Sequence, residues 1–220
     1  MPGCLVTRHA GSVVFKQGRR VNIDERPALE LAAQHGLPVP RVYDAGESDG
    51  EAFIQMDFVQ GDRLDRVWPQ MTAEERNSIC RQLREILARM RSIPCKTGLI
   101  GSCSGGKAQD DRQYSHYSDG PYADEAAFNS SFYLDLLEST PTPIRTALCQ
   151  QVRSDHRIVF THGDLAQHNI LVKDGQITGL LDWENAGWYP EHWDYIKFFE
   201  RPFYDNELAC HQAIIRWQNP

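Results

Sequence analysis

Three polar residues in the second half of the chain are suited to chemistry at a metal ion. Asp164, Asn169 and Asp182 lie within the segment VFTHGDLAQHNILVKDGQITGLLDWE, residues 159–184. Carboxylate and amide oxygens are the ligands that a hard cation such as Mg²⁺ prefers. An aspartate beside such a cation can also orient a hydroxyl group and accept its proton. The segment therefore predicts a metal-assisted reaction at a hydroxyl group.

A β-hairpin is expected to bring Asn169 and Asp182 together. Residues 170–172 and 177–181 are apolar runs on either side of Asp174-Gly175, and Asp-Gly is a strong signal for a two-residue hairpin turn. This turn predicts a register in which Val172 pairs with Ile177, Leu171 with Thr178, and Asn169 with Leu180.

The predicted register assigns each side chain to one face of the hairpin. Side chains alternate between the two faces of a strand, so Asn169 and Asp182 share a face as diagonal neighbours. Diagonal positions lie about 7 to 8 Å apart at the backbone, which lets both side chains reach one cation. Leu171 and Leu180 are expected on the same face, as an apolar floor for a base. Asp164, on the loop before the hairpin, would lie beside the metal.

The spacing of these residues resembles the catalytic segment of a kinase family. His162-Gly163-Asp164 with Asn169 follows the pattern H-x-D-x-x-x-x-N, and Leu181-Asp182-Trp183-Glu184 occupies the metal-binding position. Glycine in place of arginine after the histidine, and Trp-Glu after the second aspartate, are similar to the aminoglycoside phosphotransferase and choline kinase type of small-molecule kinase. The resemblance covers about residues 12–200 and is most specific over residues 162–184.

The resemblance implies a role for each candidate residue. Asp164 would be the catalytic base or orienting group, and Asn169 and Asp182 would hold Mg²⁺. Lys16 resembles the strand lysine that contacts the nucleotide phosphates, and Glu25 resembles the helix glutamate that pairs with it. The implied reaction transfers the γ-phosphoryl group of ATP to a hydroxyl group of a small molecule, with ATP and Mg²⁺ as cofactors.

The segment Met56-Asp57-Phe58-Val59-Gln60-Gly61 resembles the hinge of such kinases. Backbone groups of Asp57, Phe58 and Val59 would face adenine, and Leu171 would lie under the base. Residues 186–190 with Trp193-Asp194 also resemble the segment that follows the metal site in this family.

The resemblance implies a two-lobed α+β fold of the protein kinase type, and local patterns agree with it. A truncated, mostly β lobe is expected over residues 1–60, on the nucleotide side, and a mainly helical lobe over residues 61–220. Thr72 and Glu75 form a capping box before a helix. One face of that helix carries Ile79, Leu83, Ile86, Leu87 and Met90. The remaining expected strands are 4–8, 12–16, 41–44 and 51–59, and the remaining expected helices are 25–35 (capped by Asp24), 123–139, 143–153 and 191–216.

The stretch GSCSGGKA, residues 101–108, is close to two known motifs. It nearly matches a phosphate-binding P-loop, and its first half matches the nucleophile elbow of hydrolases with cysteine in place of serine. Both motifs need a strand before the loop and a helix after it, whereas Pro94 and Gly98 interrupt the approach and no helix pattern follows. Residues 92–121 are therefore expected to form a flexible surface loop.

Several other residues have two interpretations. His162 is expected to brace its loop by hydrogen bonding rather than to transfer a proton, and a zinc site formed with Asp164 and His168 is disfavoured because no second shell is readable. Packing is favoured over substrate contact for Trp183, Trp188 and Trp193. Four acidic residues are either solvated charges or the lining for a cationic substrate: Asp124, Glu125, Glu191 and Asp194.

Composition excludes several classes of protein. The chain has 220 residues and a formal net charge of -7, which gives no overall basic surface for nucleic acid. No apolar run is long enough to span a membrane, and the six cysteines show no metal-ligand spacing. We therefore expect a cytoplasmic protein with reduced thiols and a small-molecule partner, without nucleic acid or membrane partners.

The beginning of the chain keeps two alternatives open. Only 15 residues precede Lys16, with glycines at positions 3 and 11 alone, whereas related kinases carry a phosphate-covering loop before this lysine. A catalytically inactive, pseudokinase-like binding module is one alternative. A family member that uses the same cleft for non-phosphoryl chemistry is the other.

Overall fold

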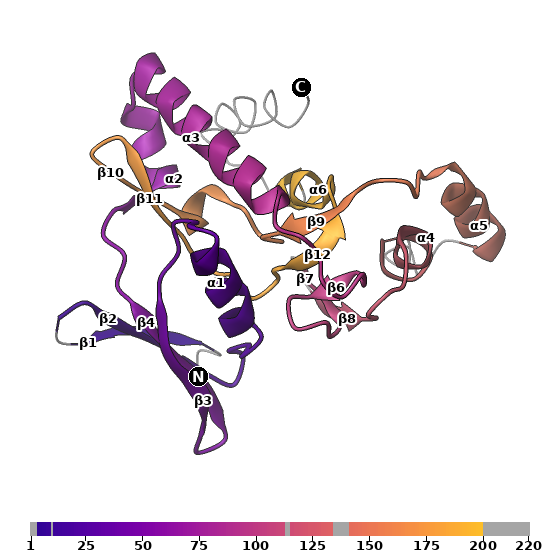
Figure 1. Cartoon of the computed structure of the whole chain (residues 1–220), viewed down its shortest axis with the longest axis horizontal. Coiled ribbons are helices and arrows are strands. Elements are labelled where there is room, and N and C mark those ends of the chain that lie inside the picture. The colour runs from indigo at the N-terminus through magenta and orange to yellow at the C-terminus, as the bar shows by residue number, and fades with distance from the viewer. Residues whose placement is uncertain (1–3, 10, 113–114, 134–140, 200–220) are drawn as a thin grey trace.

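A four-stranded antiparallel sheet, with strand order β1-β2-β4-β3, forms the N-terminal lobe (Figure 1). The structure is a computed structural model and describes residues 4–9, 11–112, 115–133 and 141–199. The four strands of this sheet are β1 (Leu5–His9), β2 (Val13–Gly18), β3 (Val42–Ser48) and β4 (Glu51–Asp57). The turn between β3 and β4 uses Asp49 and Gly50, both with positive φ, as expected for a tight hairpin turn.

Helix α1 (Glu25–Gln34) packs against this sheet through a buried face that includes Leu29 and Ala32. The predicted cap of this helix was wrong, because the Asp24 side chain makes no capping hydrogen bond. Asp24 already has helical dihedral angles, and its carboxylate accepts a hydrogen bond from Ser104 Oγ at 3.3 Å. Helix α1 begins at the next residue, Glu25, which is buried.

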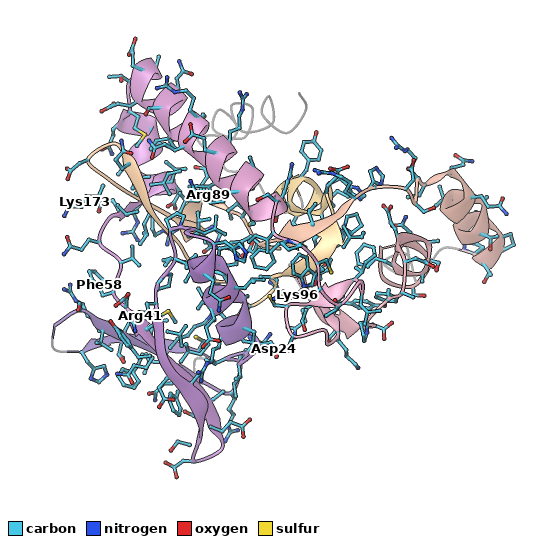
Figure 2. The ribbon with its side chains drawn as sticks, viewed as in Figure 1. Asp24, Arg41, Phe58, Arg89, Lys96 and Lys173 are labelled. Carbon is cyan, nitrogen blue, oxygen red and sulfur yellow. The ribbon has the colours of Figure 1, made fainter. Side chains whose placement is uncertain are left out.

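Helix α3 (Ala73–Arg91) forms the main support of the C-terminal lobe. Its capping box between Thr72 and Glu75 is confirmed, and so is the buried face predicted from the sequence. The helix follows α2 (Leu64–Val67) and a 3₁₀ turn, η1 (Trp68–Gln70). Arg89 near its end donates a hydrogen bond to the Gly36 carbonyl oxygen at 2.8 Å, which connects α3 to the end of α1 (Figure 2).

Two small antiparallel sheets complete the core of the C-terminal lobe. The first has the order β11-β10-β5, with β5 (Asp62–Arg63), β10 (Ile170–Lys173) and β11 (Gln176–Leu180). The second has the order β6-β12-β9, with β6 (Gly101–Ser102), β12 (Gly187–Pro190) and β9 (Ile158–Thr161). Trp183, Trp188 and Trp193 are all buried, which confirms packing as their role.

The expectation of a flexible loop over residues 92–121 was wrong. Two residues of GSCSGGKA form β6, and a hairpin of β7 (Ala108–Arg112) and β8 (Ser115–Asp119) follows. Gly101 is buried so closely against Gly106 that an added Cβ would lie 2.3 Å from the Gly106 carbonyl oxygen. The rejection of the P-loop agrees with the structure, because no helix follows this stretch and Lys107 lies outside the large cleft described below.

The helices after this hairpin are short in the part of the chain that the structure describes. They are α4 (Glu125–Phe128), a π-helical turn η2 (Asn129–Tyr133), α5 (Thr142–Gln151) and α6 (Trp193–Phe199). The predicted helices over 123–139 and 191–216 extend into residues 134–139 and 200–216, which lie outside the described residues. Among the described helices, none has the length and apolar character needed to cross a membrane.

Candidate active site

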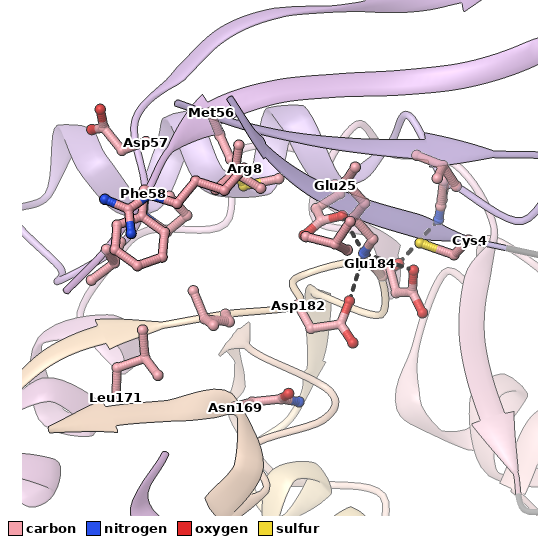
Figure 3. Close-up of a pocket in the computed structure, with 18 of the residues that line it drawn as sticks. Cys4, Arg8, Glu25, Met56, Asp57, Phe58, Asn169, Leu171, Asp182 and Glu184 are labelled. Atoms are coloured by element: carbon pink, nitrogen blue, oxygen red, sulfur yellow. Dashed lines mark hydrogen bonds and ion pairs between the residues drawn. The ribbon is translucent and has the colours of Figure 1, made fainter. Parts of the chain in front are cut away.

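A cleft of about 1370 Å³ lies between the N-terminal sheet and the β10–β11 hairpin (Figure 3). Residues from β1, β2 and β4 line one side, and residues from the hairpin and the segment after it line the other. The cleft brings together most of the candidate site residues predicted from the sequence: Lys16, Glu25, Asp57, Phe58, Val59, Asn169, Leu171 and Asp182.

Lys16 is the centre of a charged cluster in this cleft. Its Nζ lies 2.8 Å from Glu25 Oε2, 2.7 Å from Asp182 Oδ1 and 3.2 Å from Glu184 Oε2. Burial lowers the pKa of the Lys16 ammonium group, but the three neighbouring carboxylates outweigh burial and raise that pKa above its ordinary value. Lys16 therefore stays charged and holds the three acidic side chains near one another.

The three carboxylates of this cluster exceed the single positive charge of Lys16. Burial raises the pKa of Glu25, and the Asp182 carboxylate adds to that effect, while Lys16 opposes it. The pKa of Glu184 is raised to about 7, again by burial first and then by Asp182. One oxygen from each acidic side chain lies within 4.8 Å of the others. Such a surplus of negative charge in a small volume suits a cation.

Asp182 is held in an unusual backbone conformation. Its φ is +66°, in the left-handed region that non-glycine residues seldom occupy. The next residue fixes this geometry, because the Trp183 N–H donates to Glu25 Oε1 at 3.2 Å and the Trp183 ring is fully buried. A strained residue fixed by its surroundings is typical of functional sites, and here it directs the carboxylate into the cleft.

The loop before the hairpin positions Asp164 and Asn169 against each other. Asn169 closes the 3₁₀ turn η4 (Gln167–Asn169), and its Nδ2 donates to the Asp164 carbonyl oxygen at 2.9 Å and to Asp164 Oδ2 at 3.0 Å. Both residues are buried. Asp164 does not itself line the cleft, whereas Asn169 does. Asn169 and Asp182 project into the same part of the cleft (Figure 3).

His162 braces this loop, as the sequence predicts. Its Nε2 lies 3.0 Å from the Leu181 carbonyl oxygen, and its Nδ1 accepts a hydrogen bond from the Asp164 N–H at 3.2 Å. Gly163 has φ +79°, and an added Cβ would lie 2.3 Å from the Asn185 carbonyl oxygen. Glycine is therefore required for both conformation and space at this position.

Two acidic residues expected to be solvated or to line a pocket are buried instead. Asp194 accepts a hydrogen bond from the Gly163 N–H at 3.0 Å, so it supports the loop from the core. Glu125 is 3% exposed and pairs with His156. Asp124 caps α4 by accepting a hydrogen bond from the Ala127 N–H at 2.8 Å.

The hairpin register differs from the prediction by one residue. Val172 pairs with Ile177 as expected, but a bulge follows and Leu171 pairs with Gly179 instead of Thr178. The expectation that Leu180 lines the cleft was therefore wrong, and Leu181 takes that place. The apolar floor consists of Leu171 and Leu181.

The hinge segment borders the cleft, but its groups face different ways. The Asp57 carboxylate accepts hydrogen bonds from the Tyr43 hydroxyl and the Arg41 N–H, and it points away from the hairpin in Figure 3. The Phe58 N–H already donates to the Ser12 carbonyl oxygen at 2.6 Å. The Phe58 N–H is therefore already bonded to another part of the chain, so the hinge does not offer this donor to a base.

Arg8, Asn22, Gln109 and Glu184 are among the cleft residues that the sequence did not predict as site residues. The Arg8 guanidinium carbon lies 3.7 Å from the centre of the Phe58 ring, and Asn22 Nδ2 donates to Gln109 Oε1 at 2.6 Å. The sequence analysis names Glu184 only as part of the motif Leu181-Asp182-Trp183-Glu184. Its position two residues after the predicted metal ligand Asp182 could have indicated a place in the site. The Asn22–Gln109 contact joins distant segments and had no such signal.

Comparisons with known proteins agree with this arrangement. A family model described as a phosphotransferase enzyme family matches residues 5–217. The aminoglycoside 3'-phosphotransferase of Streptomyces fradiae is 25% identical over 180 residues, covering 77% of this chain and 60% of that protein. That of Enterococcus faecalis is 24% identical over 182 residues, covering 79% and 64%. The chain therefore spans less than two thirds of the length of these relatives.

Solved structures with the same fold include enzymes with bound nucleotide or antibiotic. A thermostable mutant of aminoglycoside phosphotransferase APH(4)-Ia, in a ternary complex with ADP and hygromycin B, superposes with a TM-score of 0.63 at 14% identity, covering 98% of this chain and 77% of that one. The gentamicin complex of APH(2")-IIa gives a TM-score of 0.64 at 13% identity, covering 98% and 73%. These neighbours confirm the two-lobed α+β fold of the kinase type. Since the family model covers nearly the whole chain and the fold agrees with it, the protein belongs to the phosphotransferase enzyme family.

Proposed function

We propose that the protein transfers the γ-phosphoryl group of ATP to a hydroxyl group of a small molecule. The observation that carries this proposal is the partly buried cluster in which Lys16 holds Glu25 and Asp182, together with the Asp164–Asn169 pair. Lysine, glutamate, two aspartates and asparagine in this arrangement are the parts that phosphoryl transfer requires. Family membership and the relatives named as aminoglycoside phosphotransferases support the same reaction.

The acidic side of the cleft fits Mg²⁺. Three carboxylates surround one ammonium group, so the cluster carries surplus negative charge when Glu184 is ionised. The Asn169 amide nitrogen donates to Asp164, which leaves its Oδ1 as the atom for a metal. We assign Asn169 and Asp182 as metal ligands, with Glu184 as a third candidate. When bound, Mg²⁺ would neutralise charge on the phosphates of ATP.

The other end of the cleft fits an adenine base. Met56 of the N-terminal sheet, Leu171 of the hairpin and the Phe58 ring lie at this end (Figure 3), and Val14 and Leu181 also line the cleft. Apolar walls on both sides suit a flat aromatic base. Lys16 would contact the phosphates between the adenine end and the acidic end.

Asp164 would orient the acceptor hydroxyl and take its proton. Its position is fixed from several directions, by Asn169, by the His162 ring and by Gly163, which is itself bound to Asp194. A base held this rigidly needs little reorganisation when the acceptor binds.

We place the boundary between the lobes at residues 60 and 61. We assign the protein to the cytoplasm, where ATP is available.

The test is a screen of ATP consumption with aminoglycosides, amino alcohols and sugars as acceptors. We expect one class to stimulate Mg²⁺-dependent ADP release, and Asp164→Asn to reduce turnover by about 10² to 10⁴. Circular dichroism of the variant serves as the control for folding. Nucleotide binding without acceptor-dependent turnover would contradict the proposal and favour a binding module.

A further inference from the structure

We propose that Glu125, His156 and His192 bind one divalent transition-metal ion of the zinc class, at a site separate from the cleft. Glu125 is the first residue of α4, His156 precedes β9, and His192 lies between β12 and α6. These elements gather in the same part of the C-terminal lobe (Figure 1). One ligand atom from each side chain lies within 4.8 Å of the other two, and none of the three residues lines the cleft.

The β9–β12 pairing fixes the two histidines opposite each other. The Glu191 N–H donates to the Arg157 carbonyl oxygen at 2.9 Å, which continues the antiparallel ladder by one pair beyond the strands. His156 and His192 form the next pair, and their ring centres are 4.4 Å apart. Their spacing is therefore set by the sheet and not by flexible loops.

Glu125 is oriented toward this histidine pair from α4. Its Oε2 accepts a hydrogen bond from the His156 backbone N–H at 2.8 Å, and its Oε1 lies 2.7 Å from His156 Nδ1. The residue is 3% exposed. A carboxylate fixed in this way already has the orientation that a metal ligand needs.

An ordinary ion pair between Glu125 and His156 does not account for His192. The His192 Nδ1 atom is buried and has no hydrogen-bond partner in the described part of the chain. A buried polar atom without a partner destabilises the folded state. An imidazole with an unpaired nitrogen, next to another imidazole and a carboxylate, is suited to a metal ion.

The chemistry of the three ligands selects the metal. Two imidazole nitrogens and one carboxylate oxygen favour Zn²⁺ over Mg²⁺ or Ca²⁺, which prefer oxygen ligands. In a tetrahedral zinc site with bonds of about 2.1 Å, ligand atoms lie about 3.4 Å apart. Ligand atoms that are now up to 4.8 Å apart would approach one another by at most about 1.4 Å, whereas Glu125 Oε1 and His156 Nδ1, now 2.7 Å apart, would separate by about 0.7 Å. A water molecule would be the fourth ligand. The ion would join α4 to the β9–β12 sheet and stabilise the C-terminal lobe.

The test is titration of the EDTA-treated full chain with Zn²⁺, followed by calorimetry and by the thermal unfolding temperature. Millimolar Mg²⁺ is present throughout to occupy the carboxylates of the cleft. We expect one Zn²⁺ per chain, a higher unfolding temperature with Zn²⁺, and a loss of affinity of about tenfold or more in His192→Gln and in Glu125→Gln. His35→Gln, at an exposed histidine at the end of α1, is the matched control and should bind like the native chain.

The His192→Gln variant also separates metal binding from folding. Because His192 Nδ1 makes no hydrogen bond with any residue that the structure describes, this variant should unfold in EDTA within about 2 °C of the native chain. Replacing Zn²⁺ with Co²⁺ should give the visible absorption of a tetrahedral complex in the native chain and not in His192→Gln. No zinc binding to the native chain would overturn the proposal, and so would unchanged stoichiometry and affinity in His192→Gln.

Discussion

Glu184 is expected to destabilise the folded protein above about pH 7, and Glu184→Gln should remove this effect. Burial, and then the Asp182 carboxylate, raise the pKa of Glu184 from its usual 4.5 to about 7 although Lys16 opposes them. In the unfolded chain the same group ionises near its usual value. The folded state therefore binds the proton more tightly, and stability falls as the pH rises from about 4.5 to about 7. The difference corresponds to about 3 kcal/mol.

The assay is urea unfolding in metal-free buffer at about pH 5 and about pH 8. We expect Glu184→Gln to raise the free energy of unfolding by about 2 to 3 kcal/mol at the higher pH and by less than about 1 kcal/mol at the lower pH. Glutamine keeps an oxygen that can accept a hydrogen bond from Lys16, which lies 3.2 Å from the present carboxylate. Glu85→Gln, on the exposed face of α3, is the same substitution and should change stability little at either pH.

The two possible contrary results have different meanings. An equal effect at both pH values would show that the carboxylate charge is not the cause. If Glu184→Gln is less stable than the native chain at the higher pH, the attraction between Glu184 and Lys16 outweighs the cost of burying Glu184. Adding Mg²⁺ at the higher pH should stabilise the native chain more than Glu184→Gln, because a cation neutralises the surplus charge.

Three further substitutions test other parts of the site. Asp182→Asn should weaken Mg²⁺-dependent nucleotide binding, measured by calorimetry, whereas Asp164→Asn should leave it nearly intact and reduce turnover by about 10² to 10⁴; equal loss of binding in both would contradict the assigned roles. Lys107→Ala should change ATP affinity by less than about threefold, and a loss above about tenfold would mean that GSCSGGKA grips phosphate after all. Gly163→Ala should cost more than about 2 kcal/mol in urea unfolding, because it adds a clash to the cost of positive φ. Gly175→Ala, with φ +72° and nothing within 4 Å, should cost only about 1 kcal/mol, and equal costs would refute the clash.

The hairpin shows how far local sequence signals reach. Asp174-Gly175 predicted the turn and the first residue pairs correctly, because a tight turn determines its nearest neighbours. The bulge came from tertiary contacts that the sequence does not display. The Thr178 hydroxyl donates to the Gln60 carbonyl oxygen at 2.7 Å, and Val59 packs so closely on Gly179 that a Cβ there would lie 2.8 Å from it. The hinge thus stabilises a register that the turn alone does not specify.

Short strands were the other element that local patterns did not predict. Residues 101–102 have no strand character of their own, and β6 exists because it pairs with β12. The same reason explains β5, which pairs with β10. Helix α3 was predicted in detail because its capping box and apolar face are local features. Long-range pairing, by contrast, depends on the fold that it helps to form.

Asp164, Asn169 and Asp182 were predicted from the spacing of one segment, but the residues that hold them in position were not. Asp194 is 31 residues beyond Gly163, to which it is bound, and nothing in the local pattern distinguishes it from a solvated acid. The same holds for Glu125, His156 and His192, which meet only through the β9–β12 register and α4. Residues that act together from distant segments are visible only after folding.

The β7–β8 hairpin has a mechanical consequence for the cleft. Gln109 has its side chain on Asn22 of the N-terminal lobe, while its backbone N–H donates to the buried Tyr189 hydroxyl at 3.0 Å. Tyr189 packs in a second apolar core with Phe128 of α4 and Trp193 of α6. The hairpin therefore connects that apolar core to the N-terminal lobe. The distance between the two lobes is fixed by this connection as well as by the hinge.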